Sequence, residues 1–152
     1  MEKERSVFKD FREDTQVILQ KCFDEDFSFS KIPKTIKKTG AEFDSEVERI
    51  KEILMVHYAR ITNIFYFYSG CSSTYPMLSM NDFTSFAKLT GILDHDVISL
   101  AALDLALVAT CMSSHEYVNS ARLDMTRYEF LEMIVRVANE MFRETKVVKT
   151  TS

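Results

Sequence analysis

The sequence predicts an all-α fold, and three observations support this prediction. Of the 152 residues 46% are hydrophobic, so the chain is long enough and apolar enough to bury a core without disulfides or metals. Only three glycines and two prolines are present, which leaves few residues for hairpin turns. Apolar residues recur at spacings of three and four along most of the chain, which is the period of an amphipathic helix.

The composition also argues against several classes of protein. No apolar run approaches the roughly 18 residues that cross a bilayer, and the first residues are charged, so we expect neither membrane insertion nor secretion. The three cysteines are far apart and odd in number, which favours reduced thiols in the cytoplasm. With 19 basic and 23 acidic side chains the net charge is -4, so we do not expect nucleic acid as a partner.

The first 43 residues predict a helix followed by a docking arm or linker. Residues 5–22 place a set of apolar side chains on one helical face: Phe8, Phe11, Ile18 and Cys22. From residue 23 to residue 43 this period is lost, and Pro33 and Gly40 interrupt the chain. An alternative is that the aromatic residues of this region fold back onto the same molecule: Phe23, Phe27 and Phe29.

Four lysines lie close together in this arm, with no acidic residue among them: Lys31, Lys34, Lys37 and Lys38. One interpretation is a solvated linker, whose charges simply face water. The other is an electrostatic attachment site for an acidic surface of a partner. The sequence leaves both interpretations open.

Residues 44–68 carry the strongest helical pattern in the chain, and Asp44 or Ser45 is the expected N-cap. The segment SGCSSTYP at 69–76 predicts the loop that ends this helix.

Capping residues mark the starts of three further helices. Ser79 and Asp82 have the spacing of a capping box, in which each side chain pairs with an otherwise unpaired backbone N–H. Ser99 is the expected N-cap of the next helix. A second capping box, Thr126 with Glu129, opens the last helix.

Two segments share one pattern, which indicates an internal repeat. Leu78–Phe86 and Met125–Met133 each begin with an apolar residue and a hydroxyl residue, followed by an acid three positions after the hydroxyl and then by Phe. This order resembles the exit of the loop in an EF-hand, a helix–loop–helix calcium-binding unit. The resemblance extends over residues 44–143 and implies an EF-hand-like pair, in which the first residues of the two segments form a short bridge between the loops. Residues 144–152 are expected to be a frayed tail.

The loops lack the ligands that calcium requires. Calcium takes about six or seven oxygens, with carboxylates or amides at loop positions one, three and five and a glycine at position six. In the first loop these positions hold Cys71, Ser73, Tyr75 and Pro76, and in the second loop Val118, Ser120, Arg122 and Leu123. We therefore expect no bound metal and no other cofactor.

No catalytic signature is present, so we do not expect an enzyme. The three histidines have no metal-ligand spacing to one another or to a cysteine. The chain also lacks the glycine-rich patterns of phosphate-binding and dinucleotide-binding loops.

The apolar and methionine-rich residues of the two repeats favour a groove for a partner helix. We assign eight residues to this partner groove: Phe65, Phe83, Phe86, Met112, Phe130, Met133, Val137 and Met141. The alternative is that these side chains close the core, since a stripe at helical spacing is usually buried.

Three segments are similar to degenerate EF-hand proteins of cilia and flagella: IFYFYS at 64–69, LSMNDFTSFAKLTGI at 78–92 and YEFLEMIVRVA at 128–138. This resemblance implies a calcium-independent structural protein of the cytoplasm, in a cytoskeletal assembly such as the ciliary axoneme. Its partners would be proteins, among them tubulin, whose acidic surface the four lysines would contact. The alternative is a calcium-responsive regulatory subunit similar to calmodulin or to a light chain.

Overall fold

The computed structural model describes residues 11–94, 98–112 and 124–151, with side chains for residues 16–94, 98–111 and 124–142. The chain in these ranges is predominantly helical, which confirms the all-α prediction. The helices are α2 (Phe11–Phe29), the 3-10 helix η1 (Ile32–Thr35), α3 (Ala41–Gly70), α4 (Met80–Leu89), α5 (Leu100–Met112) and α6 (Arg127–Thr151). Two strands of two residues each, β1 (Leu78–Ser79) and β2 (Asp124–Met125), complete the described elements. None of the described helices combines the length and apolar character of a membrane span.

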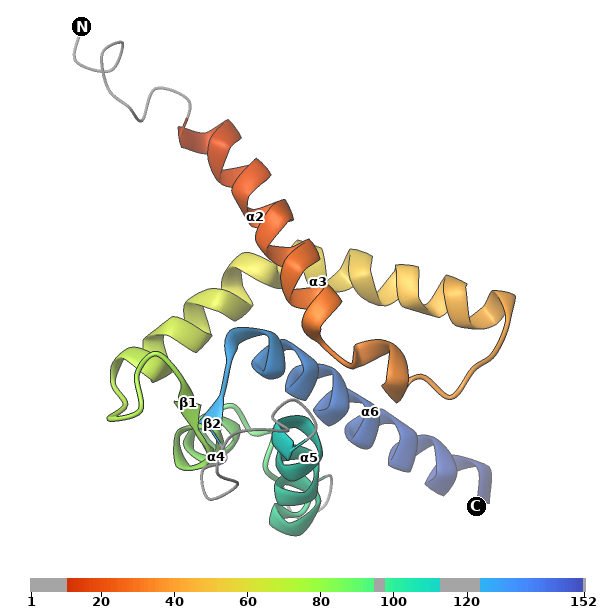
Figure 1. The fold of residues 1–152 in the computed structure, drawn as a ribbon. Helices are drawn as coiled ribbons and strands as arrows, with labels where there is room; N and C mark the ends of the chain where they lie inside the picture. Colours follow the sequence, from red (N-terminus) through yellow and green to blue (C-terminus); the bar gives the residue numbers. More distant parts are fainter. Residues whose placement is uncertain (1–10, 95–97, 113–123, 152) are drawn as a thin grey trace, which may run out of the picture.

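Helix α6 occupies the middle of the molecule. It lies below α2 and α3 and above α4 and α5 in the view of Figure 1, and it contacts α2, α3, α5 and η1. Two hydrophobic cores therefore form on neighbouring faces of one helix. Phe130, Met133 and Val137 face the first core, whereas Leu131 and Val135 face the second.

The first core joins α4 and α5 to α6 and to the C-terminal half of α3. Phe130 is its centre, because its ring packs against Phe65 at 5.7 Å, Phe83 at 6.0 Å and Phe86 at 6.0 Å between centroids. Aromatic rings at these separations add favourable edge interactions to the burial of their area.

These same aromatic residues belong to the predicted partner groove, and the prediction of an open groove is wrong for them. Six of the eight residues are buried in the first core: Phe65, Phe83, Phe86, Phe130, Met133 and Val137. Met141 is partly buried against the same core, and the side chain of Met112 lies outside the described residues. The helices approach closely enough for these side chains to fill the space between them. The side chains therefore stabilise the fold and are not open to a partner.

The two helix–loop–helix units meet where their loops end. Strands β1 and β2 are antiparallel, and Leu78 is paired with Met125, which is the bridge that the EF-hand resemblance implies. Both side chains are buried, with 1% and 0% of their surface exposed. The capping residues follow directly: the Asp82 N–H donates to Ser79 Oγ at 3.2 Å, and the Thr126 N–H donates to Glu129 Oε1 at 3.3 Å.

The N-terminal arm is part of the fold rather than a linker that starts at residue 23, and the alternative that its aromatic residues fold back is confirmed for Phe23 and Phe27 but not for Phe29, which is exposed. Helix α2 continues to Phe29, and Phe23 and Phe27 are buried in the second core with Leu54 and Tyr58 of α3. The buried Asp26 stands among these apolar residues and conceals the helical period in the sequence. Side chains from before and after the predicted boundary at residue 43 therefore pack in the same core. Residues 5–10 of the predicted helix, including Phe8, lie outside the described residues.

Two helix ends also differ from the predictions. Helix α3 begins after Gly40 rather than at Asp44 or Ser45, since Gly40 has φ of 63°, a backbone conformation that glycine adopts without strain. Helix α6 runs to Thr151, so residues 144–151 are helical rather than frayed. No glycine or proline is present there to end the helix. The predicted N-cap Ser99 is confirmed, because its Oγ accepts from the Ala102 N–H at 3.2 Å.

A buried ionic cluster joins α2 to the rest of the molecule. Asp26, which is 3% exposed, accepts two hydrogen bonds from Arg127 of α6, from Nε at 2.7 Å and from Nη2 at 3.1 Å. The Tyr58 hydroxyl of α3 donates to the same carboxylate, and Arg127 Nη1 donates to Tyr66 Oη at 2.8 Å. The hydrogen bonds to Asp26 hold the pKa of Arg127 above its ordinary value, and burial raises the pKa of Tyr58, so both partners keep their protons.

Removing the charge of Asp26 tests this cluster. We expect Asp26→Asn to lower the free energy of unfolding by about 2–3 kcal/mol, because Arg127 then lacks its counter-ion in a partly buried position. The measurement is denaturant unfolding followed by circular dichroism. Asp24→Asn is the matched control on the exposed face of α2, where we expect a change below about 0.5 kcal/mol. Equal effects of the two substitutions would show that the cluster does not hold α2.

Candidate basic groove

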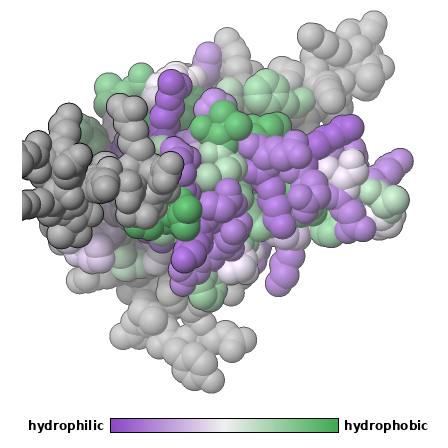
Figure 2. Space-filling view, turned by 90° about the horizontal axis from the view of Figure 1, so that it is seen from above, coloured by the Kyte–Doolittle hydropathy of each residue, from purple (hydrophilic) through white to green (hydrophobic). Residues whose placement is uncertain are grey.

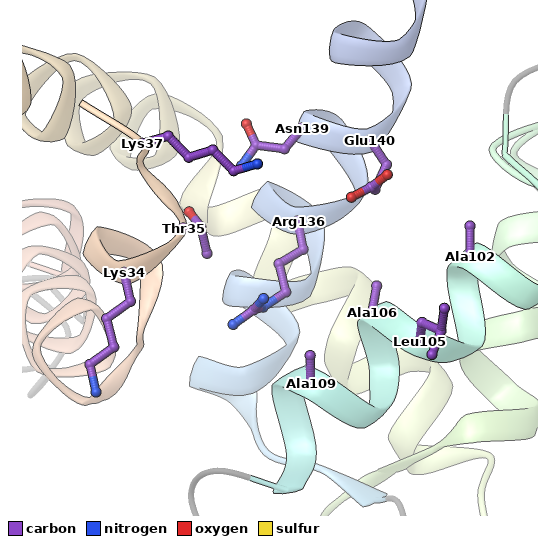
Figure 3. A pocket seen from close by; sticks show the side chains of 10 residues that line it. All are labelled: Lys34, Thr35, Lys37, Ala102, Leu105, Ala106, Ala109, Arg136, Asn139 and Glu140. Atoms are coloured by element: carbon purple, nitrogen blue, oxygen red, sulfur yellow. The ribbon is translucent and has the colours of Figure 1, made fainter.

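A groove of about 400 Å³ lies over α6, between the segment that starts with η1 and helix α5. Figure 3 shows its three sides. The η1 segment contributes Lys34, Thr35 and Lys37, helix α6 contributes Arg136, Asn139 and Glu140, and helix α5 contributes Ala102, Leu105, Ala106 and Ala109. Two of the four lysines that the sequence singled out thus line a concave surface.

The groove is positively charged although the chain as a whole is acidic. Its lining holds three cations, Lys34, Lys37 and Arg136, against the single carboxylate of Glu140. Lys37 extends toward Asn139, and Arg136 points into the space between η1 and α5 (Figure 3). Lys34 and Lys37 are exposed, so their ammonium groups are available to an approaching anion. Cations gathered in a concavity raise the local concentration of acidic ligands.

The wall opposite the lysines is apolar. It consists of the small side chains Ala102, Ala106 and Ala109 and of Leu105, which is 71% exposed. Small side chains along a helix allow another chain to approach its backbone closely. The groove therefore combines a basic rim with an apolar surface.

Glu132 fixes the η1 side of the groove to its floor, helix α6. It is 1% exposed, and its Oε1 accepts the backbone N–H of Lys31 at 2.6 Å. Its Oε2 accepts from Nε of Arg136 at 3.2 Å and lies 3.9 Å from the Lys31 ammonium. One buried carboxylate thus positions both the start of η1 and the guanidinium of the groove, and the two cations compensate its burial.

Lys31 is not a free attachment residue, which corrects part of the predicted lysine site. Its side chain is only 15% exposed, and its Nζ donates to the carbonyl oxygens of Thr110 at 3.2 Å and Ala109 at 3.4 Å. These carbonyls lie in the last turn of α5, where a cation is favourable. The remaining lysine, Lys38, is exposed and lies 3.4 Å from the Glu46 carboxylate of α3. An exposed ion pair of this kind is weak, so Lys38 can exchange this partner for another.

The loop between α3 and α4, which the sequence compares with an EF-hand loop, is closed by its own side chains. Ser72 Oγ and Thr74 Oγ1 are hydrogen-bonded at 2.7 Å, and Thr74 Oγ1 donates to the Met77 carbonyl at 3.1 Å. The acid at the end of the loop, Asp82, accepts from Ser79 Oγ at 2.6 Å. These hydroxyls thus bond to one another and to the loop's own backbone. Most of the second loop, residues 113–123, lies outside the described residues.

Other chemistry has little support among the described residues. They contain no group of three or more His, Cys, Asp or Glu side chains that could hold a metal ion. Burial and, to a smaller extent, the nearby Glu129 carboxylate raise the pKa of the Cys111 thiol to about 12, so the reactive thiolate is scarce at neutral pH.

The sequence alone did not reveal Glu132, Arg136 and the alanine wall as parts of this site. Glu132 and Arg136 are four residues apart, which is a recognisable helical ion pair, but the same spacing is common on solvated helices. The alanines form a helical stripe in a segment that is apolar throughout. Only the approach of η1 to α5 makes these residues neighbours of Lys34 and Lys37.

Comparison of the chain with protein-family models, with curated proteins and with solved structures finds no match.

Proposed function

We propose that this protein is a calcium-independent interaction module, an EF-hand-like pair that attaches to an acidic protein surface through its basic groove. The observation that carries the proposal is the concentration of Lys34, Lys37 and Arg136 in one concavity of a chain with net charge -4. A basic site on an acidic protein favours anionic partners at that site and repels them elsewhere.

The EF-hand-like part of the proposal is supported by the pairing of strands β1 and β2. Leu78 and Met125 bridge two helix–loop–helix units, and a capping acid follows each bridge. A module of this kind needs no cation to keep its shape, because hydroxyl groups close the first loop and the aromatic core fills the space between the helices. The predicted role as a rigid structural component depends on this independence.

The setting that we propose is a cytoskeletal assembly of the cytoplasm, such as the ciliary axoneme, with the acidic surface of tubulin as partner. The similarity of three segments to degenerate EF-hand proteins of cilia and flagella suggests this setting. The exposed lysines of the η1 segment, Lys34, Lys37 and Lys38, suit a sequence-independent electrostatic contact. The competing proposal is a calcium-responsive regulatory subunit, which would use the same helix pairs as a switch.

Co-sedimentation with microtubules tests the proposed partner. We expect the intact chain to pellet with microtubules at low salt, and the variant Lys34→Glu, Lys37→Glu, Lys38→Glu to stay in the supernatant, because three attractive charges become repulsive. The matched control, Lys21→Glu, Arg60→Glu, Lys88→Glu, changes the net charge equally at exposed positions away from the groove. Equal co-sedimentation of both variants and the unchanged chain would contradict attachment through these lysines.

Calcium titration separates the two proposals. We expect calorimetric titration of the metal-free protein to give no binding heat, and millimolar calcium to leave the midpoint of thermal unfolding unchanged. A ligand that binds the folded state raises this midpoint by mass action, so even a modest site would be detected. Micromolar calcium binding with a raised midpoint would favour the regulatory subunit and overturn calcium independence.

A further inference from the structure

We infer that the basic groove binds an acidic, amphipathic peptide segment of a partner protein, with its carboxylates on Lys34, Lys37 and Arg136 and its apolar side chains on the α5 wall. This inference rests on the proposed function and specifies the kind of ligand that the groove takes. It also adds Arg136 and Leu105 to the lysines as determinants of binding.

The charges of the lining favour an anionic ligand. The cations come from two separate elements, η1 with its following segment and α6, so a ligand that contacts all three must lie across the groove (Figure 3). Arg136 donates from Nε to Glu132, and this contact orients the guanidinium that Figure 3 shows pointing between η1 and α5. A guanidinium held in this way recognises a planar carboxylate better than a mobile ammonium does.

The apolar wall favours a peptide over a small inorganic anion. Leu105 is 71% exposed beside Ala102, Ala106 and Ala109, and a phosphate or a lone carboxylate would leave this surface in contact with water. A segment that alternates acidic and apolar residues covers both the rim and the wall. The volume of about 400 Å³ accommodates a few side chains rather than a folded domain.

Apolar side chains are exposed outside the groove as well. On the face that Figure 2 shows, hydrophilic and hydrophobic side chains lie side by side. Apolar side chains are also exposed on α3, notably Ile53, Val56 and Phe67, and this helix does not line the groove. The groove between η1 and α5 differs from the α3 surface in that its concave lining holds three cations beside the apolar wall.

Binding of a labelled model peptide tests the inference on the intact chain. The probe is a fluorescein-labelled peptide of Glu, Ala and Leu, and its counterpart carries Gln in place of every Glu; fluorescence anisotropy reports binding. We expect the Glu peptide to bind with an affinity that falls as salt is raised, and the Gln peptide to bind much more weakly. Equal binding of the two peptides would overturn the inference.

Variants at exposed positions locate the binding without disturbing the fold. We expect Lys34→Gln, Lys37→Gln to weaken binding about fivefold, because two exposed charges that attract the peptide are lost from the rim. Leu105→Ser should weaken it by a similar factor through lost apolar contact. The matched control, Lys21→Gln, Lys88→Gln, Leu89→Ser, removes exposed lysines and an exposed leucine elsewhere and should change binding less than about twofold. A control variant that weakens binding as much as the groove variants would overturn the assignment.

The two proposals can fail separately. Microtubule co-sedimentation without binding of the Glu peptide would overturn the inference about the groove and leave the cytoskeletal proposal standing. Peptide binding that depends on Lys34, Lys37 and Leu105, without microtubule co-sedimentation, would support the groove and remove tubulin as the partner.

Discussion

Helix α6 is buried on two neighbouring faces, and the other elements take their places from this burial. A helix in this position must satisfy every polar side chain that it takes into the interior. Arg127 pairs with Asp26 of α2, and Glu132 pairs with Lys31 at the start of η1. These pairs tie α2 and η1 to defined positions on α6, while the apolar residues supply most of the burial.

The groove follows from the same arrangement. Because Glu132 fixes the start of η1, the lysines that follow are carried to one side of α6, while α5 packs against the other. The space between them is lined by Arg136, which the same carboxylate orients. The charge of the groove and its shape thus both depend on Glu132, a buried acid that binds the two cations Lys31 and Arg136 from different elements. The same residues thus form a structural contact and line the groove for which we propose a binding role.

Sequence reasoning predicted the elements whose signals are local and missed those that depend on distant partners. The capping residues Ser79, Ser99 and Thr126 act within one turn, so their helices begin where the pattern indicates. The extension of α2 to Phe29 depends on Arg127, about a hundred residues away, which makes a buried Asp26 acceptable in an apolar stripe. The aromatic stripe around Phe130 has the same spacing in a core as in a groove, and only the packing of α4 and α5 distinguishes the two. Lys31 resembles its neighbours in sequence but faces the end of α5.

Hydrogen exchange of the intact chain, followed by mass spectrometry, tests most directly the claim that α6 unites the two cores into one cooperative unit. The account predicts that amides around Phe23–Phe29 of α2 exchange as slowly as those around Phe130–Val137 of α6, since both would open only when the whole structure unfolds. Exchange of the α2 amides at the rate of an unfolded peptide, with α6 still protected, would contradict it. In that case the N-terminal segment would be a separate arm, and the groove between η1 and α5 would not be a stable part of the fold.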